Sequence, residues 1–527
     1  MIYVAFLCLF ALALGQESEN PSRRITDQCQ RTVDVAVIGA GTTGAYAAYK
    51  LKDQQLKVEV VELKDVAGGR HQTVYLPDVP SIPVELGQRM YADIHPIMQR
   101  LVSELGLTQE VFPEGWANKE RFYLKGQHYR QEDIESNSVT LPYDLTPEEK
   151  QNQGNIVKFY FKKLTGLDLQ PLMPREQRLL LKVIKTNKRL YEHRIDEALD
   201  LVASPGGKEF FKAIVKSRYA IYKDASALLV FGDEMDYNNA NTTLYKVREG
   251  MDSIPKKLIE KFTMASSSNK VTFNRKLEAI QRFQNMTYIL KLKETKTVDG
   301  RIIELGPEEF LCAKQVILAI PKDSLDHLQW SGTKGWTQRM ALNAVRPVPE
   351  HRVVMSFNVD FWSGTDFPKM TNIKFTDTVL GSLQALGKSN NQNLLLATLN
   401  SGEEVRQLER LNLGSPTQGS LNGTLQVSED LKSAIVDKLF EIFKLQSRSL
   451  INPISSVARF WTVPPHVGGV TVWRAGFHFE DARQSLQHPS LIDKVYIVTP
   501  DIAFGNRQEW TEGGLEDVDR IMQKYIL

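Results

Sequence analysis

The clearest pattern of apolar and polar positions lies near the N-terminus. An apolar run, VDVAVI, leads into glycines at positions 39, 41 and 44, and an Ala-rich stretch with helical periodicity follows as far as Leu51. A second apolar run, KVEVVE, ends at Glu62. The pattern predicts a strand, a tight turn, a helix and a second strand. This unit is typical of a Rossmann-type domain and puts the protein in the α/β class.

The middle of the chain changes to a helical pattern. From Pro142 to about Tyr245 apolar residues recur at helical spacing, and the stretch begins with Thr146, Pro147 and Glu149, the signature of a capping box with proline at the first helical position. We interpret this stretch as a helical subdomain with an apolar core face.

Sheet character returns after residue 248. The pattern predicts a helix in GMDSIPKKLIEKF, strands in VTFNRKLEAI, TYILKLK and RIIEL, and a hairpin turn at Asp299 and Gly300. A further strand, QVILAI, ends at Pro321. A polar stretch from 412 to 422 is expected to be an exposed loop. The chain ends with a strand in KVYIVTPD and a helix from Glu512 to Tyr525.

The composition is that of an ordinary globular protein. The 527 residues are 42% hydrophobic and 24% charged, enough for two or three packed units. With 65 basic and 63 acidic residues the net charge is +2, which argues against a large nucleic-acid or anionic-lipid surface. We therefore expect small-molecule partners, no nucleic acid and no metal site.

Residues 1–15 form an apolar block, with Ala13 and Gly15 where a signal peptidase would cleave. We interpret the block as a signal peptide of a secreted protein, because it is shorter than the ~20 apolar residues of a membrane-spanning helix. A membrane anchor is the alternative, and no later stretch could span a bilayer. The sequons at Asn241, Asn285 and Asn422 fit secretion and a glycoprotein.

Two cysteines remain once the signal peptide is removed. Cys29 and Cys312 each lie a few residues before an apolar strand that we assign to the nucleotide domain. If those strands run parallel and close together, a disulfide bond could join their starts.

The glycines of the first turn suit a dinucleotide. Gly39 allows a tight turn, Gly41 lets the backbone approach a pyrophosphate, and Gly44 lets the helix pack on the strand. Glu62 would accept hydrogen bonds from the ribose hydroxyls of an adenosine. Further on, GGR (residues 68–70) gives a second glycine turn with a guanidinium suited to phosphate. A Rossmann-like domain without a nucleotide is the alternative.

These motifs together resemble a known family. The GxGxxG turn, the E-x5-GGR, the VELG after Pro83, the strand ending in AIP, and Asp501 followed by Trp510, Glu512 and Gly513 resemble the flavin amine oxidases. Within that family the chain looks similar to the secreted gastropod L-amino-acid oxidases of the escapin, aplysianin and achacin type. The stretches that carry this resemblance are RFYLKGQ, LPYDLTPEEKQNQGN, LVASPGGKEF, QVILAIP, VRPVP and WRAGFHFED.

The resemblance implies a fold of three parts. A discontinuous FAD-binding domain would comprise residues 31–72, 246–322 and 488–527. A substrate domain with a mixed sheet would comprise 73–135 and 323–487, and a helical domain 136–245. The implied reaction is the FAD-dependent oxidation of an L-amino acid by oxygen, which gives an oxo acid, ammonia and hydrogen peroxide. In the gastropod members the peroxide is defensive or antimicrobial.

The resemblance also assigns roles to individual residues. The helix that begins near Trp510 would point its N-terminus at the flavin, where negative charge gathers on reduction. Arg89 would bind the substrate carboxylate, and Arg352 would act in the reaction with oxygen. The residues expected to bind the cofactor are Gly39, Gly41, Thr42, Thr43, Gly44, Glu62, Arg70, Gly87, Gln88, Leu277, Asp501 and Glu512. FAD would be non-covalent, because no cysteine lies beyond Cys312, and His71 is interpreted as a surface or packing histidine.

The sequence departs from the family pattern at three places around this site. The family has G-x-M-R where this chain has Gly87-Gln88-Arg89-Met90, and a lysine where this chain has Arg352. It has a glycine and a small residue where this chain has Thr499 and Pro500.

Two other functions therefore stay open. One is a glycoprotein on the same scaffold, with little or no turnover and a structural or binding role in egg mass, mucus or matrix. The other is an amine or polyamine oxidase. A homo-oligomer also stays open.

Overall fold

The computed structural model describes residues 29–112, 121–168, 188–215, 225–236, 242–283, 286–363, 372–463, 465–503 and 507–527. The predicted signal peptide and the sequons at Asn241 and Asn285 lie outside the described residues.

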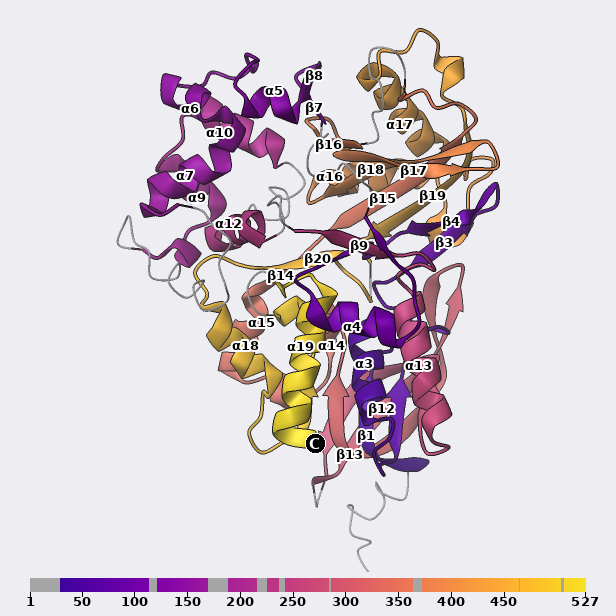
Figure 1. Ribbon diagram of the computed structural model, residues 1–527. Helices are drawn as coiled ribbons and strands as arrows, with labels where there is room; N and C mark the ends of the chain where they lie inside the picture. The colour runs from indigo at the N-terminus through magenta and orange to yellow at the C-terminus, as the bar shows by residue number, and fades with distance from the viewer. Residues whose placement is uncertain are drawn as a thin grey trace, which may run out of the picture.

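A seven-stranded sheet forms the lower half of the molecule in Figure 1. Its order is β10-β2-β1-β13-β12-β11, and β21 also pairs with β13. The strands are β1 (Arg31–Ile38), β2 (Val58–Val61), β10 (Lys270–Thr272), β11 (Arg275–Arg282), β12 (Tyr288–Val298), β13 (Arg301–Leu318) and β21 (Val495–Ile497). The core is parallel, and β11 and β12 join it antiparallel. Segments from both ends of the chain thus build one sheet.

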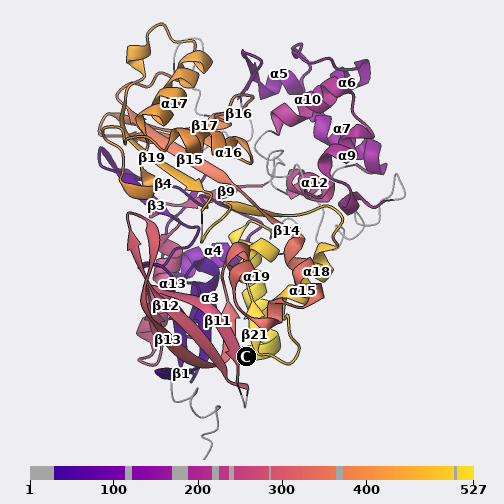
Figure 2. The ribbon, with the colours of Figure 1, turned by 180° about the vertical axis from the view of Figure 1, so that it is seen from behind.

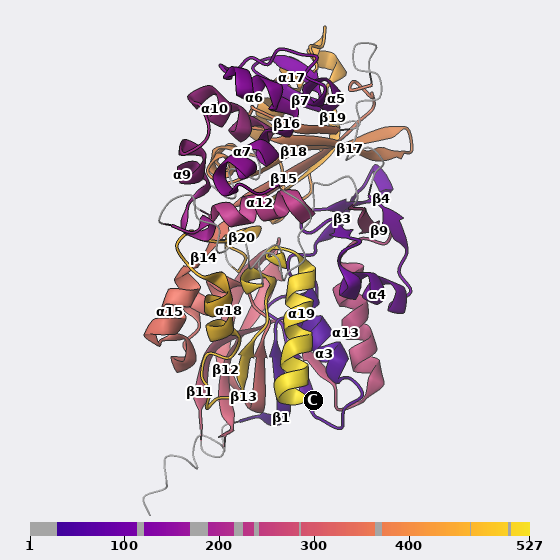
Figure 3. The same cartoon turned by 60° about the vertical axis from the view of Figure 1, so that its left-hand side comes forward.

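Helices cover one face of this sheet. They are α3 (Thr42–Leu51), α4 (Pro96–Glu104), α13 (Ser253–Ala265) and α19 (Thr511–Ile521). Their apolar faces share one buried cluster with β1 and β2, and Figure 3 shows α19, α3 and α13 side by side over the strands. Parallel strands alternating with packed helices confirm the α/β fold class.

Strand β13 differs from the sequence prediction. RIIEL and QVILAI are not separate strands, because one strand runs from Arg301 to Leu318. Its first part pairs with β12 and its last part lies between β1 and β21. The middle is exposed and polar, which hid its continuity in the sequence. The predicted turn is confirmed, since Asp299 and Gly300 have φ angles of 50° and 76°.

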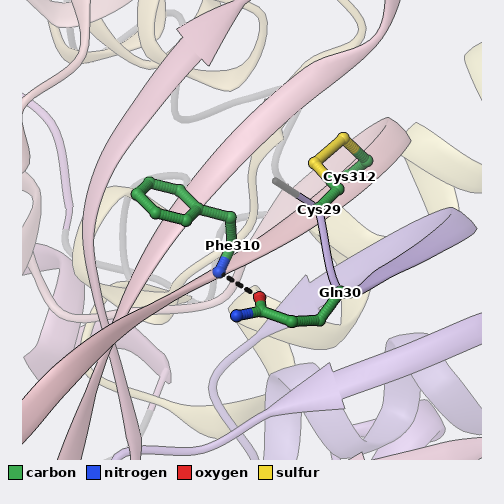
Figure 4. The surroundings of a disulfide bond; sticks show 4 residues. All are labelled: Cys29, Gln30, Phe310 and Cys312. Atoms are coloured by element: carbon green, nitrogen blue, oxygen red, sulfur yellow. Dashed lines mark hydrogen bonds between the residues drawn. A yellow bond between two sulfur atoms is a disulfide. The ribbon is translucent and has the colours of Figure 1, made fainter. Parts of the chain in front are cut away.

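The predicted disulfide bond is present, and it joins the residues before β1 to the part of β13 where that strand begins to pair with β1. Cys29 and Cys312 have Cα atoms 5.8 Å apart, and they are 283 residues apart in the chain. Thr32 pairs with Cys312 in the parallel register. Figure 4 shows the bond beside the side-chain oxygen of Gln30, which accepts a 2.7 Å hydrogen bond from the backbone N–H of Phe310.

A second seven-stranded sheet lies at the upper right of Figure 1, in the order β19-β15-β18-β17-β16-β7-β8. The strands are β7 (Arg121–Leu124), β8 (Gln127–Arg130), β15 (Glu350–Phe357), β16 (Asn372–Thr376), β17 (Ser382–Ser389), β18 (Gln392–Ser401) and β19 (Pro453–Trp461). All pairs are antiparallel except β16 with β7, so the sheet is mixed. Its outer face packs on a cluster with α16 (Glu404–Leu411) and α17 (Glu429–Ile442). Its inner face packs on the hairpin of β3 (Thr73–Leu76) and β4 (Val79–Glu85).

Smaller elements connect the two sheets. One small sheet contains β5 (Tyr91–Ala92), β6 (Gln109–Val111) and β9 (Leu244–Val247), and another contains β14 (Val345–Val348) and β20 (Val470–Trp473). Helix α14 (Lys322–His327) packs on β14. Seen from behind in Figure 2, α15 (Trp336–Asn343) and α18 (Phe479–Gln487) lie beside β14.

A group of helices stands apart at the upper left of Figure 1. They are α5 (Gln131–Glu135), α6 (Pro147–Gln151), α7 (Ile156–Thr165), α9 (Ile195–Asp200), α10 (Pro205–Ile214) and α12 (Ala227–Asp236). The capping box at α6 is as predicted, because Thr146 Oγ1 accepts from the Glu149 N–H and the Glu149 carboxylate accepts from the Thr146 N–H. In the described part of the chain, no helix has the length and apolar character to cross a membrane.

Candidate active site

A cavity of about 450 Å³ lies where the two sheets meet. It begins at the ends of β1, β2 and β13 and reaches β15 and β19 of the mixed sheet. Its volume is in the range of ligand-binding pockets. The predicted site residues that line it are Gly39, Gly41, Thr42, Thr43, Glu62, Arg70, Gly87, Gln88, Leu277 and Arg352. Thr499 and Pro500 also line it, so together with Arg352 two of the three departures from the family pattern lie in its wall.

The first glycine turn leaves no room for side chains. Gly39 has a φ of +100°, and a Cβ there would lie 2.6 Å from the carbonyl oxygen of Ala319. A Cβ on Gly44 would lie 1.9 Å from the carbonyl oxygen of Gly39. Gly44 does not line the cavity among the described residues, and its contact instead seats α3 against β1. The turn therefore needs glycine for backbone packing as well as for access to a ligand.

The second glycine turn lies against the first. A Cβ on Gly69 would lie 3.0 Å from the Cα of Gly41, and the Gly68 N–H donates to the Ala40 carbonyl. The next residue, Arg70, forms an ion pair with Asp501. The Asp501 carboxylate also accepts a 2.8 Å hydrogen bond from the Lys322 N–H. The fold thus brings together two predicted cofactor-binding residues that lie 431 positions apart in the chain.

Glu62 is buried at the end of β2. Its carboxylate accepts hydrogen bonds from the backbone N–H of Ala40 at 2.6 Å and of Lys64 at 2.9 Å. Burial raises the pKa of Glu62, and these backbone donors act in the opposite direction. The carboxylate therefore holds the glycine turn and borders the cavity at the same time.

Two helix N-termini open onto the cavity side by side. Thr42 and Thr43 begin α3, and Thr511 begins α19. His71 lies between them, with Nδ1 2.8 Å from Thr42 Oγ1 and Nε2 3.0 Å from Thr511 Oγ1. Burial lowers the pKa of His71 to about 4, so the ring is neutral at neutral pH. His71 is therefore a buried packing residue and not a surface histidine, and it also lines the cavity.

Gly87 and Gln88 form the seam between the two sheets. A Cβ on Gly87 would lie 1.8 Å from the carbonyl oxygen of Arg70, which accepts a hydrogen bond from the Gln88 N–H. On the other side, the indole N–H of Trp461 donates to the Leu86 carbonyl at 2.8 Å. This segment is thus fixed by both halves of the molecule.

Arg352 projects from β15 into the wall of the cavity. One guanidinium nitrogen donates to the carbonyl oxygen of Gly87, and another donates to the Glu350 carboxylate at 2.7 Å. The side chains of both members of this ion pair are 9% exposed. The sequence predicted Arg352 at this site but not its carboxylate partner.

Arg89 lies close by, although it is absent from the described residues that line the cavity. Its guanidinium donates to the side-chain oxygen of Gln384 on β17 at 2.7 Å and stacks 5.3 Å above the ring centroid of Phe112. Burial and the Arg352 charge lower the pKa of Arg89, while Glu350 raises it. The preceding Gln88 side chain donates to the Met90 carbonyl.

Two predicted residues at the start of α19 make other contacts. Trp510 is the N-cap residue, and its ring packs edge-on against His95 with centroids 4.9 Å apart. Glu512 accepts hydrogen bonds from the N–H groups of Ile97 and Met98, both at 2.9 Å, in the first turn of α4. Like Asp501, neither residue is among the described residues of the cavity wall. The α-helix is shorter than predicted, because α19 ends at Ile521 and a π-helical turn follows.

Sequence reasoning missed several residues of the cavity wall. Glu350 lies two positions before Arg352, so strand periodicity could have placed it on the same face. His466 is buried against Trp461, and no sequence signal indicates it. Glu509 has a φ of +74°, a left-handed conformation that is unusual for a residue other than glycine.

These residues fit a flavin dinucleotide. The glycine turns would admit a pyrophosphate, the two helix N-termini favour anions, and Glu62 lies where a ribose would follow. The Nε–H of Arg352 and the Nδ1 of His466 are buried with no hydrogen-bond partner in the described structure, as expected of groups that contact a ligand. Within the same ranges, no cluster of three or more His, Cys, Asp or Glu side chains could hold a metal ion. The fold and cavity thus define a dinucleotide-dependent oxidoreductase with a second domain over the cofactor.

The chain belongs to the flavin containing amine oxidoreductase family, whose sequence pattern matches residues 43–487. It is 37% identical to Aplysianin-A of Aplysia kurodai, over 95% of this chain and 91% of that protein. It is 33% identical to Achacin of Lissachatina fulica, over 99% and 98% of the two chains. The resemblance seen in the sequence is thus confirmed.

More distant similarities are consistent with this family assignment. L-amino acid oxidase Bs29 of Bothriechis schlegelii is 24% identical over 48% of this chain and 47% of its own. The structure of cyclohexylamine oxidase from Brevibacterium oxydans superposes with a TM-score of 0.66 at 16% identity, and covers 93% of this chain and 97% of that one. At this identity the similarity concerns the fold. The protein is a flavin-dependent oxidoreductase, and FAD is its cofactor.

Proposed function

We propose that this protein is a secreted FAD-dependent L-amino-acid oxidase. It would convert an L-amino acid, oxygen and water into an oxo acid, ammonia and hydrogen peroxide, and the peroxide would be a defensive or antimicrobial product. Its similarity to Aplysianin-A, Achacin and an L-amino acid oxidase supports this reaction. The exposed sequon at Asn422 supports passage through the secretory route.

The observation that carries the proposal is the charge around Gly87 and Gln88. Arg352 and Glu350 line the cavity there, and Arg89 follows directly in the chain. Because burial and the Arg352 charge lower the pKa of Arg89, a negative charge brought next to its guanidinium is stabilised. An amino-acid carboxylate supplies such a charge, and an arginine can bind it with two parallel hydrogen bonds.

In this proposal each element has a separate task. Arg89 binds the substrate carboxylate and so orients the α-carbon. FAD, held by the two glycine turns and Glu62, would supply the redox chemistry, a two-electron oxidation of the substrate at its α-carbon with oxygen as the final acceptor. The N-termini of α3 and α19 stabilise negative charge on the cofactor. The mixed sheet supplies one wall of the cavity, and the low dielectric constant of that wall strengthens these interactions.

The test is a peroxide assay on the purified protein with each L-amino acid and with the corresponding decarboxylated amine. We expect peroxide from at least one L-amino acid. Arg89→Met should raise KM for that substrate and lower kcat/KM, by a factor that corresponds to a loss of about 2–5 kcal/mol of transition-state binding. The FAD content should be unchanged. Arg339→Met, on an exposed face of α15, is the matched control and should leave kcat/KM unchanged. FAD-loaded protein that no L-amino acid can bleach under anaerobic conditions contradicts the proposal.

The contacts of Arg89 and the position of Pro500 favour two alternatives, an amine or polyamine oxidase and a scaffold glycoprotein. Its hydrogen bond to Gln384 means that the guanidinium already has an acceptor, and Pro500 removes one N–H from the cavity wall. An amine or polyamine oxidase needs no carboxylate-binding arginine, and a scaffold glycoprotein needs no turnover. Oxidation of amines but not of amino acids would indicate the former, and bound FAD without any turnover the latter.

A further inference from the structure

We propose that Glu350 is a positioning residue that holds Arg352 in an ion pair with no net charge, with the Nε–H of Arg352 directed to the bound flavin. This inference rests on the FAD site rather than on the identity of the substrate. It deepens the proposed function by naming a residue that the sequence did not indicate.

The strand geometry brings the two side chains together. Glu350 and Arg352 are separated by one residue on β15, so they project from the same face of the mixed sheet. That face is directed to the cavity, which both side chains line. The Glu350 carboxylate accepts from the terminal nitrogen of Arg352 at 2.7 Å, and both side chains are 9% exposed. The pair is therefore closed off from bulk water.

The surrounding chain is shaped to admit this pair. A Cβ on Gly469 would lie 2.6 Å from the Cβ of Glu350 and 3.2 Å from its carboxylate oxygen. Only glycine at position 469 leaves the space that Glu350 occupies. Opposite, the Gly87 carbonyl accepts from the other terminal nitrogen of Arg352. The guanidinium is thus fixed on two sides, by a carboxylate and by a backbone carbonyl.

The Nε–H of the guanidinium is available to a ligand. Arg352 Nε is buried and has no hydrogen-bond partner in the described structure. A buried N–H without an acceptor is unfavourable, and native proteins rarely leave one. Because Arg352 borders the cavity beside Gly87 and Gln88, an acceptor atom of the bound flavin, or a water held on it, completes the set.

The Glu350 carboxylate determines the net charge next to the flavin. A buried arginine alone would present a full positive charge, which stabilises reduced flavin because reduction adds negative charge. Paired with Glu350, the side chain presents a directional N–H with little net charge. Glu350 therefore sets the redox potential of the flavin through Arg352, without touching the cofactor itself.

The experiment measures the midpoint potential of the flavin in FAD-loaded protein, by equilibration with redox dyes. Glu350→Gln should raise the potential, with the affinity for reduced relative to oxidised FAD increased at least tenfold, which is about 30 mV for a two-electron couple. Glu350→Asp keeps the charge and should stay within threefold of the wild type. The double variant Glu350→Gln with Arg352→Gln removes both charges and should also return to within threefold.

Arg352→Gln alone should shift the potential in the opposite direction, and it carries the test if Glu350→Gln cannot be recovered folded. Glu149→Gln is the matched control, since this buried glutamate accepts hydrogen bonds in the distant helical group and should not change the potential. An unchanged potential in Glu350→Gln overturns the inference, and so does a double variant shifted as far as Glu350→Gln. No amino acid is needed for these measurements, so they succeed or fail independently of the peroxide assay.

Discussion

Glu62 holds the glycine turn and is also predicted to bind the ligand. Its carboxylate accepts from the N–H groups of Ala40 and Lys64 while it borders the cavity. The sequence indicated the ligand contact from the position of an acidic residue at the end of the second strand. The backbone contacts could not be predicted, because they depend on the shape of a turn 22 residues earlier in the chain.

Glu62→Gln tests the first of these tasks. The amide keeps the size of the side chain but loses the charge that strengthens a hydrogen bond to a ribose hydroxyl. We expect FAD binding to weaken by about 1–3 kcal/mol, roughly 5- to 150-fold in Kd. Titration of the apoprotein with FAD, followed by flavin fluorescence, measures the change. An unchanged Kd would mean that Glu62 acts on the turn alone.

At the scale of elements, the N-terminal turn of α19 connects three parts of the molecule. Thr511 contacts His71, Trp510 packs against His95, and Glu512 caps the first turn of α4. The periodicity of apolar residues predicted the helix itself, because its buried face is encoded in consecutive turns. Its partners at the N-terminus come from residues more than 400 positions away and were not predictable.

The buried carboxyl group of Glu512 should make the free energy of unfolding depend on pH. Burial raises the pKa of Glu512 to about 7, against 4.5 for the ordinary group. The folded protein thus binds this proton more tightly than the unfolded protein does, so the stabilisation is complete below about pH 4.5 and is lost as pH rises through about 7.

Glu512→Gln removes that proton equilibrium. We therefore expect the free energy of unfolding of the wild type to fall by about 1–2 kcal/mol more than that of Glu512→Gln between pH 5 and pH 8. Denaturant unfolding of both proteins at several pH values provides the comparison. Subtracting the two profiles cancels other buried carboxyl groups, such as Asp517, whose pKa is also raised to about 7. Parallel profiles would exclude this role for Glu512.

On the scale of the whole molecule, the disulfide bond connects β1 and β13, which are neighbours in the first seven-stranded sheet but lie far apart in the chain. The loop between Cys29 and Cys312 contains most strands of that sheet together with the helical group. The sequence permitted this bond only on the condition that two apolar strands lie parallel and adjacent. The register of β1 with β13 meets that condition.

Removing the bond should destabilise the fold. In the chain-entropy model a loop of 283 residues corresponds to about 4 kcal/mol or more of stabilisation. We expect Cys29→Ser, Cys312→Ser and the double variant to lose the same free energy of unfolding, since each removes one and the same bond. Intact mass after alkylation provides the chemical check. A wild-type protein from which the N-terminal 15 residues have been removed should take up no label when it is unfolded without reductant.

The sequence by itself determined what depends on neighbouring residues. The glycine turn at 39–44, the capping box at Thr146 and the apolar strands follow from backbone conformation and side-chain periodicity, and these are properties of short segments. The family resemblance added the order of the motifs and hence the cofactor. Only the tertiary structure decided which partners the arginine side chains meet: Arg70 with Asp501, Arg89 with Gln384, and Arg352 with both Glu350 and Gly87. Most of these partners lie hundreds of residues apart, and packing of the two sheets selects them. A pattern along the chain carries no information about which of many possible charged neighbours that packing will bring together.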